Sequence, residues 1–435
     1  MHEPPTPRPA SGRRFLLLQG PHGPFFAALG RRLRAAGAEV WRVGFNRGDE
    51  AFWRGPGYIA FRDPPEDWPG TCARLIADRR ITDLVLYGDT RPVHAAAITL
   101  ARAAGVTVHV FEEGYLRPYW ATYERNGSNG NSRLMRIPVA EMRRVLDRAG
   151  DLPPAPARWG DMRQHVFYGA LYHFLILTLN RRYRNFRSHR EIPVAREFRL
   201  HLRRLMLMPL AYVARIAATA RIRRGARPYH LVLLQLEHDA SFRSHSDFAS
   251  MADFVTRCLD GFARGAPPHH HLVFKAHPLE DGRGGVAATI RREAARRGLG
   301  ARVHYLAGGK LAPLLDGASS AVTINSTAGQ QVLWRGLPLK ALGRAVYSKP
   351  EFVSPQPLEA FFARPEPPDP RAYAVYRQYL METSQLPGGF YSRRGRRLLL
   401  QRCIAMMLAP EDPYDSLRHR TAAAWQQSRP SRTGA

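Results

Sequence analysis

A hydroxyl-rich stretch in the second half of the chain has residue types that bind phosphate. Asn325, Ser326 and Thr327 follow the apolar run 321–324, and Gly329 lies in the helix-like segment that comes next. A strand that leads through such residues into a helix presents backbone N–H groups and hydroxyls to a phosphate. The pattern predicts a phosphate cradle with a helix that begins near Ser326.

A second apolar run, residues 272–274, ends in cationic and imidazole donors. Lys275, His277 and Pro278 follow it. Taken alone, His277 is more typical of a buried histidine that bonds a loop carbonyl, but its combination with the loop at 326–327 favours ligand binding. Two neighbouring strand ends with such donors predict a nucleotide site.

Two carboxylates stand at the end of a strand-like run in the first half of the chain. Glu112 and Glu113 follow the apolar residues 106–111 and precede Gly114. A carboxylate at a strand end inside a cleft can have a raised pKa and act as an acid or base. Solvated loop glutamates are the commoner alternative, but the position at a strand end favours function.

The first loop of the chain also follows a strand and enters a helix. Gly20, His22 and Gly23 lie in it. Glycines allow a ligand to approach the backbone closely, and His22 could reach that ligand. An ordinary tight turn between a strand and a helix accounts for the same residues.

Asp239 comes shortly after another strand-like run, residues 230–234. An aspartate there could act as a nucleophile or stabilise an oxocarbenium-like centre, as carboxylates do in glycosyl chemistry. The alternative is an aspartate that caps the N-terminus of a helix, and the residues alone favour that alternative.

The elements that position these residues alternate between strands and helices. In the first half, strand-like runs at 15–18, 39–43, 83–87 and 106–111 alternate with helix-like segments at 25–36 and 93–104. In the second half, strand-like runs recur at 230–234, 272–274, 303–305, 321–324 and 339–342. Such alternation predicts parallel, doubly wound sheets whose ligands bind beyond the carboxyl ends of the strands.

The chain therefore divides into segments of different character. We expect a disordered tail at 1–12, a Rossmann-like acceptor-side domain at 13–150 and a helical, basic, amphipathic segment at 151–228. A Rossmann-like nucleotide-sugar domain is expected at 229–350, then helices at 351–410 that pack back on the first domain, and a polar tail at 411–435. Within the basic segment, the aromatic and arginine-rich stretch 183–190 could bind phosphates or lipid headgroups, although such a run is usually a solvated face.

Composition narrows the class of partner. The chain has 435 residues, of which 45 % are hydrophobic, so it can build two cores. Its formal net charge is +29, and arginine supplies most of it. A basic surface favours anionic partners such as nucleic acid, phospholipid headgroups or sugar nucleotides. No nucleic-acid-binding motif is visible, so we expect no nucleic-acid partner.

Targeting signals and cysteines indicate a reducing compartment. Residues 1–12 lack the apolar core of a signal peptide, and the most apolar run, 166–179, falls short of the roughly 20 residues of a spanning helix. We expect a cytoplasmic protein that associates with a membrane surface. The cysteines lie far apart and form no disulfide framework or zinc spacing: Cys72, Cys258 and Cys403.

Several motifs in one order resemble a known family. The chain from 13 to 391 is similar to the bacterial capsule polysaccharide biosynthesis and export family of the KpsS/LipB type, through the motifs at 18–26, 45–49, 112–118, 185–190, 275–278 and 325–329. The resemblance implies a GT-B-like α/β fold with two Rossmann-type domains and a helical, basic insertion between them. It also implies a glycosyltransferase that moves β-Kdo from CMP-Kdo to lysophosphatidylglycerol, which starts the lipid linker of the capsule.

The resemblance also implies roles for particular residues. Asp239 matches the nucleophile of related retaining β-Kdo transferases, and Glu113, the second expected catalytic residue, matches an acidic position in a motif that lines the donor sugar site. The expected nucleotide-sugar site comprises Lys275, His277, Pro278, Asn325, Ser326, Thr327 and Gly329. The expected substrate-binding residues are Gly20, His22, Gly23, Glu112, Arg117, Arg187, His189 and Arg190.

Cofactor and partners follow from the same resemblance. We expect no cofactor and no metal, because Lys275, His277 and the helix start near Ser326 can neutralise the phosphate. The expected partners are CMP-Kdo, lysophosphatidylglycerol or a related anionic lipid, the inner face of the inner membrane, and other capsule assembly and export proteins. The alternative is a non-catalytic protein that binds the capsule glycolipid and hands it over for export.

Overall fold

The computed structural model divides into two compact units. It describes residues 10–146, 162–186, 213–225, 227–237, 239–278, 280 and 284–419. Unit 1 comprises Met1–Arg133, Met142–His189 and Arg377–Ala435, and unit 2 comprises Leu134–Glu141 and Arg190–Tyr376. The divisions fall within helices α5 (Val139–Val145) and α14 (Pro370–Thr383).

Unit 1 is built on a seven-stranded sheet of order β12-β6-β5-β4-β1-β2-β3. Its five parallel strands are β1 (Arg14–Leu17), β2 (Glu39–Gly44), β3 (Tyr58–Ala60), β4 (Asp83–Tyr87) and β5 (Thr107–Glu113). Two further strands extend the sheet beyond β5: β6 (Trp120–Arg125) pairs antiparallel with β5, and β12 (Gln385–Pro387) pairs antiparallel with β6. The carboxyl ends of β5, β4 and β1 therefore lie next to one another.

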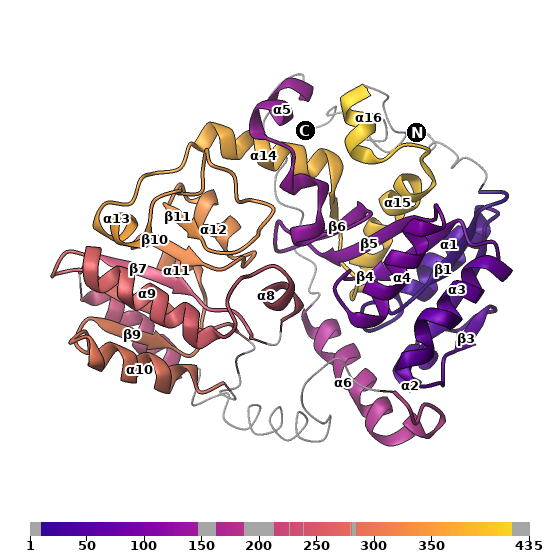
Figure 1. Cartoon of the computed structure of the whole chain (residues 1–435), viewed down its shortest axis with the longest axis horizontal. Helices are drawn as coiled ribbons and strands as arrows, with labels where there is room; N and C mark the ends of the chain where they lie inside the picture. Colours follow the sequence, from indigo (N-terminus) through magenta and orange to yellow (C-terminus); the bar gives the residue numbers. More distant parts are fainter. Residues whose placement is uncertain are drawn as a thin grey trace. The chain divides into compact units, whose positions relative to one another are not determined.

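Helices cover both faces of this sheet (Figure 1). One core joins residues of α1 (Phe25–Ala35) and α15 (Arg393–Leu408) to the sheet, and the other joins residues of α3 (Trp68–Asp78) and α4 (Pro92–Ala103) to it. The other helical elements described in this unit include α2 (Arg47–Ala51), α6 (Met162–Leu179), α16 (Pro413–His419), η1 (Pro65–Asp67), η2 (Asn129–Asn131) and η4 (Asn180–Arg182), and η3 (Arg133–Met135) crosses the boundary between the units.

Unit 2 contains a smaller, wholly parallel sheet of order β11-β10-β7-β8-β9. Its strands are β7 (Tyr229–Leu233), β8 (His271–Lys275), β9 (Val303–Leu306), β10 (Ala318–Thr323) and β11 (Leu339–Ala341). Its described helices include a segment at 213–224, α8 (Ala240–Ser244), α9 (Met251–Gly265), α10 (Val286–Arg296), α11 (Ala312–Leu315), α12 (Gly329–Trp334) and α13 (Leu358–Ala363).

Local signals account for the longest helix of unit 2. Ser250 caps α9: its side chain accepts the N–H of Asp253, and the Asp253 carboxylate accepts the N–H of Ser250. This capping box satisfies N–H groups that the first turn of a helix leaves free. Apolar residues recur along one face of α9, including Phe254, Cys258 and Phe262, and they join the core beneath α10 and α13.

The fold class expected from the sequence is confirmed, since both units contain parallel α/β sheets of the Rossmann type. Every strand of the expected alternation is present within a few residues of its predicted position. The sequence missed β3, β6 and β12. Of the helices expected at 351–410 to pack on the first domain, α13 instead packs on α9 in unit 2, whereas α15 packs on α1 in unit 1.

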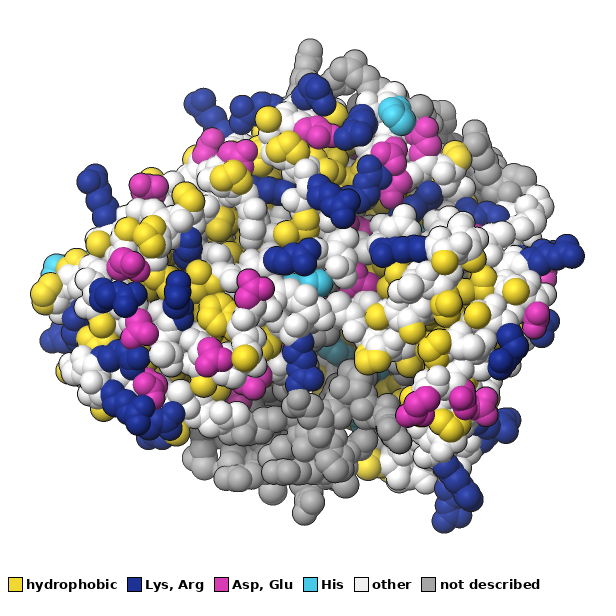
Figure 2. Space-filling view, in the orientation of Figure 1, with side chains coloured by type: hydrophobic (Ala, Val, Ile, Leu, Met, Phe, Trp, Pro, Cys, Tyr) yellow, Lys and Arg dark blue, Asp and Glu magenta, His cyan; other side chains and the backbone are white. Residues whose placement is uncertain are grey.

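Charged side chains are distributed over the face of the molecule that Figure 2 shows. Figure 2 shows Lys and Arg side chains spread over the visible face, with Asp and Glu between them. The three cysteines are buried and free. Among the described residues, no helix combines the length and the apolar character needed to cross a membrane.

Candidate functional site

The predicted nucleotide residues of unit 2 gather at the carboxyl edge of its sheet. Lys275 is the last residue of β8, and His277 lies two residues beyond it. Asn325 and Ser326 follow the end of β10. Strand β7 lies between β10 and β8, so its exit at Gln235 separates the two groups. The two strand ends share this edge of the sheet, but they are not adjacent as predicted, because β7 lies between them.

Gln235 joins the β7 and β10 exits. Its side-chain Nε2 donates to Asn325 Oδ1 at 2.8 Å, and its Oε1 accepts the backbone N–H of Asn325 at 3.0 Å. Asn325 Nδ2 donates to the carbonyl of His245 at 3.0 Å. Both amides are buried. The Asn325 side chain therefore holds the loop in place. Ser326 and Thr327 are then the residues of this loop that we expect to contact a ligand.

The loop after β10 differs from the expected helix start. Helix α12 begins at Gly329 rather than near Ser326, and it has six residues. Ser326 Oγ accepts the N–H of Ala328 at 3.2 Å, and the Ser326 carbonyl accepts the hydroxyl of Tyr347 at 2.6 Å. A side chain at 329 would collide with Tyr347, since an ideal Cβ there lies 2.7 Å from its hydroxyl oxygen. Gly329 is therefore required for packing.

Lys275 is a buried cation at this edge. Its side chain is 5 % exposed, and its Nζ donates to the carbonyl of Ala276 at 3.1 Å. Burial, assisted by the positive charge of Arg215, lowers the pKa of the Lys275 ammonium to about 8. At neutral pH the group is still mainly charged, and it can attract an anion. His277 is partly buried, and Pro278 beside it is exposed.

Asp239 follows the exit of β7 at the carboxyl edge of the unit 2 sheet, four residues after Gln235. It is exposed and directly precedes α8. Its N–H donates to the carbonyl of Leu236 at 2.9 Å, and its carbonyl accepts the N–H of Arg243 at 3.1 Å. Asp239 therefore occupies the start of a short helix, as the capping alternative requires. Its exposure also leaves the carboxylate accessible to a substrate.

In unit 1, the two predicted glutamates end strand β5 and point to opposite faces of the sheet, because successive strand residues alternate. Glu113 Oε1 accepts the hydroxyl of Tyr87 at 3.0 Å and that of Tyr391 at 3.2 Å. Glu112 Oε1 accepts the N–H of Glu113 at 3.1 Å, and its Oε2 would lie 3.2 Å from a Cβ at Gly88. The two carboxylates thus have different surroundings.

The surroundings of Glu112 change its pKa. Burial raises the pKa of the Glu112 carboxyl to about 7, while the N–H of Glu113 opposes the shift. The negative charge of Glu113 raises the pKa further, and the positive charges of Arg117 and Arg91 oppose that. Glu112 can therefore exchange a proton near neutral pH. Glu113 is held in place by two tyrosines.

The predicted loop after β1 contacts helix α6. The imidazole of His22 stacks on the Tyr172 ring with centroids 4.3 Å apart, and His173 meets His22 edge-on at 5.4 Å. Gly23 has φ of +112°, and a Cβ there would lie 3.0 Å from the Tyr168 ring. A Cβ at Gly20 would lie 2.7 Å from the Phe26 ring. Both glycines are therefore needed for close packing.

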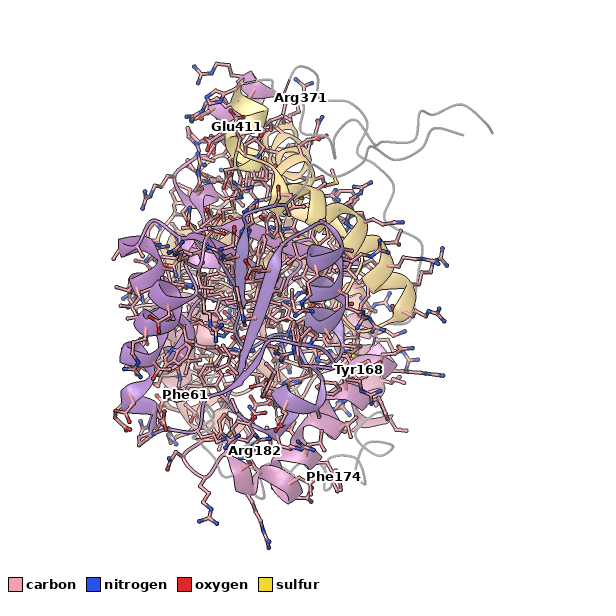
Figure 3. All side chains as sticks on the ribbon, turned by 90° about the vertical axis from the view of Figure 1, so that its right-hand side faces the viewer. Phe61, Tyr168, Phe174, Arg182, Arg371 and Glu411 are labelled. Carbon is pink, nitrogen blue, oxygen red and sulfur yellow. The ribbon has the colours of Figure 1, made fainter. Side chains whose placement is uncertain are left out.

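Helix α6 is anchored to α2 by polar groups. Tyr172 accepts a hydrogen bond from Asn46 Nδ2 at 2.7 Å, and Asn180 Oδ1 accepts the N–H of Arg47 at 2.9 Å. Arg182 Nη1 donates to Glu50 Oε1 at 2.8 Å. Tyr168, Phe174 and Arg182 lie on this segment in Figure 3, with Phe174 and Arg182 near the lower end of that view.

Another predicted substrate residue, Arg117, lies close enough to Glu112 for its charge to act on the pKa of that carboxyl. Arg117 is exposed, and its Nε donates to the carbonyl of Gly114 at 3.2 Å. Arg187, His189 and Arg190 lie outside the described residues, as does most of the predicted basic segment. No group of three or more His, Cys, Asp or Glu side chains is arranged for metal binding in the described part of the chain.

Sequence reasoning missed several residues that contact the predicted ones. Gln235, Tyr391 and Tyr172 lie far along the chain from their partners, so no local pattern indicates these contacts. The sequence could have indicated Gly308 and Gly309, because paired glycines directly after a strand are typical of a turn or loop. Asp89, which accepts the N–H of Ser128 at 2.9 Å, follows the end of β4 and could have been found in the same way.

Comparisons with known proteins identify the family of this chain. Residues 82–391 match the family described as capsule polysaccharide biosynthesis protein. The chain is 30 % identical over 387 residues to the capsule polysaccharide export protein KpsS of Escherichia coli, covering 88 % of this chain and 97 % of that protein. It is 31 % identical over 388 residues to the capsule polysaccharide modification protein LipB of Neisseria meningitidis serogroup A, covering 88 % and 93 %.

Among solved structures, the chain is similar to Thermosulfurimonas dismutans KpsC, beta Kdo 2,7 transferase. The TM-score is 0.43 at 11 % identity, and the match covers 90 % of this chain and 97 % of that one. The family match spans more than half of the sequence, and the two relatives above align over nearly their full lengths. The chain therefore belongs to the capsule polysaccharide biosynthesis protein family.

Proposed function

We propose that this protein is a retaining glycosyltransferase that moves β-Kdo from CMP-Kdo to lysophosphatidylglycerol, the first step of a capsule lipid linker. Unit 2 is assigned to the donor and unit 1 to the acceptor. The observation that supports this most is the placement of Lys275, His277 and the Ser326 loop at the carboxyl edge of one parallel sheet, where Gln235 at the exit of β7 between them bonds Asn325. Membership of the capsule family supplies the biological context.

The donor side suits a leaving nucleotide. When the bond to Kdo breaks, negative charge develops on the CMP phosphate, and preorganised donors stabilise it. Lys275 supplies a buried positive charge, and His277 and Ser326 supply donors at the neighbouring exits. CMP is already a good leaving group, so these residues need not include a strong acid.

The proposed reaction has two displacements. The Asp239 carboxylate attacks the anomeric carbon of Kdo, the bond from that carbon to the phosphate oxygen breaks, and CMP leaves with the electron pair. The acceptor hydroxyl then attacks the same carbon, the bond to Asp239 breaks, and a glutamate takes the hydroxyl proton. Two inversions restore the β configuration.

We assign the proton-accepting role first to Glu112. Glu113 Oε1 already accepts two tyrosine hydroxyls, which orient that carboxylate. Glu112 has a raised pKa of about 7, close to the pH at which the enzyme must work. Glu113 then serves to position the acceptor or the sugar.

The acceptor is a membrane lipid, and α6 offers an apolar surface. Phe167 is 61 % exposed and Phe174 55 % exposed, and Arg181 and Arg182 follow at the end of the helix. Apolar side chains beside arginines suit an anionic bilayer surface. We therefore propose a peripheral association with the inner face of the inner membrane through this helix.

Purified protein incubated with CMP-Kdo and lysophosphatidylglycerol tests the proposal. Release of CMP that requires the lipid is expected. Asp239→Ala should lose transfer but keep CMP affinity, because the carboxylate attacks the sugar and not the nucleotide. The matched control is Asp247→Ala, an exposed aspartate eight residues further on, which should transfer normally. Full activity of Asp239→Ala would refute the double displacement.

A non-catalytic handover protein is the second candidate, favoured by the name of the Escherichia coli relative, an export protein. This candidate predicts that the protein binds the finished glycolipid and releases no CMP from CMP-Kdo. The same assay therefore separates the two functions.

A further inference from the structure

Two cationic side chains of unit 2 lie together without an acidic partner. Lys275 ends β8, and Arg215 comes from a helical segment over residues 213–224. The Nε of Arg215 is buried and has no hydrogen-bond partner, and neither residue forms an ion pair with any part of the chain that the structure describes. The charge of Arg215 reaches Lys275, because it lowers the pKa of the Lys275 ammonium. Lys275 is buried and Arg215 is partly buried, so each loses part of its hydration, and a bound anion would offset that loss.

A glycine turn faces the Arg215 side chain. Gly308 and Gly309 follow the end of β9, which is paired with β8 through Leu306 and Lys275. An ideal Cβ at Gly308 would lie 3.4 Å from Arg215 Nε. At Gly309, a Cβ would lie 3.9 Å from both Arg215 Cβ and Thr219 Oγ1.

The backbone of this turn needs glycine. The φ angles are +114° at Gly308 and +87° at Gly309, a region that other residues rarely adopt. The carbonyl of Leu306 accepts the N–H of Ala276 at 2.9 Å and that of Gly308 at 2.8 Å, so the turn is tied to the exit of β8. The absence of side chains at 308 and 309 leaves room for Arg215, which packs against the turn beside the exit of β8.

We propose that Arg215, Lys275 and the Gly308–Gly309 turn form an anion-binding subsite at the carboxyl edge of the unit 2 sheet, which takes an anionic oxygen group of the donor. Arg215 can form two parallel hydrogen bonds to a carboxylate or phosphate, and Lys275 adds a compact charge. The identity of the donor rests on the proposed function, whereas the choice of an anion rests on the two cations and on the unpartnered Nε of Arg215. The group is either the phosphate of the nucleotide or the carboxylate of the sugar.

Isothermal titration calorimetry with three probes tests the subsite: CMP, free Kdo and inorganic phosphate. Arg215→Gln should weaken the binding of at least one probe tenfold or more, and Arg215→Lys should restore part of it. The matched control is Arg224→Gln, which removes an exposed arginine from the same helical segment and should change affinities less than twofold. Loss of phosphate and CMP binding identifies the phosphate as the occupant, and loss of Kdo binding identifies the carboxylate.

A second variant separates binding from folding. Lys275→Met removes a buried charge, so the ligand-free protein should unfold at the same or a higher temperature while anion affinity falls tenfold or more. A lower melting temperature with unchanged affinity would show a structural lysine and overturn the proposal. Equal affinities in Arg215→Gln and Arg224→Gln for all three probes, or no binding of any probe to the wild type, would also overturn it.

The outcomes distinguish this subsite from the proposed function. Phosphate binding that depends on Arg215 in a protein that never transfers Kdo would keep the subsite and reject the reaction. Kdo transfer with unchanged kcat and KM in Arg215→Gln would keep the reaction and reject the subsite.

Discussion

Gln235 and Asn325 pair reciprocally across 90 residues of sequence: Gln235 Nε2 donates to Asn325 Oδ1 at 2.8 Å, and Gln235 Oε1 accepts the Asn325 N–H at 3.0 Å. This pair links the exits of β7 and β10. It therefore fixes the loop that contains Ser326 relative to the segment that leads to Asp239. Loss of the Gln235 amide removes both of these hydrogen bonds.

Gln235→Ala should destabilise the fold by roughly 1–3 kcal/mol, because the buried Oδ1 and N–H of Asn325 each lose a hydrogen bond. Urea unfolding measures the change in the free energy of unfolding. Gln331→Ala is the matched control, since Gln331 is partly exposed on α12, and it should change stability by less than about 0.5 kcal/mol. Equal stability of the two variants would contradict a structural role for the pair.

The Glu112 carboxyl predicts a pH dependence of transfer. Its pKa of about 7 means that the base is protonated at lower pH, so kcat should rise as the pH increases through about 7. Glu112→Gln should lower kcat about 10²–10⁴-fold and remove that rise. Glu113→Gln should lower activity but keep the rise. A pH–rate profile that is unchanged in Glu112→Gln would move the proton-accepting role to another residue.

His230 predicts acid sensitivity of unit 2. It is fully buried, and its ring nitrogens contact Ser320 Oγ at 2.8 Å and His270 Nδ1 at 2.9 Å. Burial, with a further contribution from His270, lowers the pKa of His230 to about 3. Between about pH 6.5 and 3 the unfolded chain binds a proton that the folded chain does not, so stability falls as the pH falls through this range.

The slope for this one group is about 1.4 kcal/mol per pH unit. His230→Asn should remove that contribution, as seen in urea unfolding at pH 7 and pH 5. His269→Asn is the control, because His269 is exposed, and it should keep the wild-type slope. A wild-type slope in His230→Asn would refute the assignment.

The exposed face of α6 predicts membrane binding. Replacing Phe167 and Phe174 together with Asp should abolish flotation with phosphatidylglycerol vesicles, because it removes the apolar contact and adds negative charge. Trp334→Asp is the control, since Trp334 is equally exposed but lies on α12 in unit 2. Wild-type protein that floats equally with phosphatidylcholine vesicles would contradict the role of the arginines.

The close packing of α6 offers an independent check of that surface. An ideal Cβ at Gly48 would lie 2.4 Å from the Tyr172 ring, which is one contact between α2 and α6. Gly48→Ala should therefore displace α6 and reduce flotation, and it should destabilise unit 1 by roughly 1–3 kcal/mol. Normal flotation and normal urea unfolding of this variant would show that the contact is unimportant.

The central strands could be predicted from the sequence because buried parallel strands are continuous apolar runs. The missed strand β6 lacks that pattern. Its Glu124 and Arg125 are buried, and Glu124 accepts hydrogen bonds from the hydroxyls of Tyr115 and Tyr414. Buried polar residues that find distant partners do not resemble a strand core in the sequence.

The candidate site could be predicted only in part, for a related reason. Polar residues directly after apolar runs identified Lys275 and Ser326, since the exits of parallel strands share one edge. The partners that fix these groups come from elsewhere in the chain, as with Tyr391, which reaches Glu113 across 278 residues. The expected start of α12 was wrong because Ser326 bonds the turn N–H of Ala328 before the helix begins.

Intact-mass spectrometry of the lipid tests the central claim most directly. Purified protein is incubated with CMP-Kdo and lysophosphatidylglycerol, and the extracted lipid is weighed. The account predicts a lipid heavier by one or more Kdo residues, in an amount equal to the CMP released, and an unchanged lipid with Asp239→Ala. A lipid of unchanged mass with the wild-type protein, together with no release of CMP, would contradict the account.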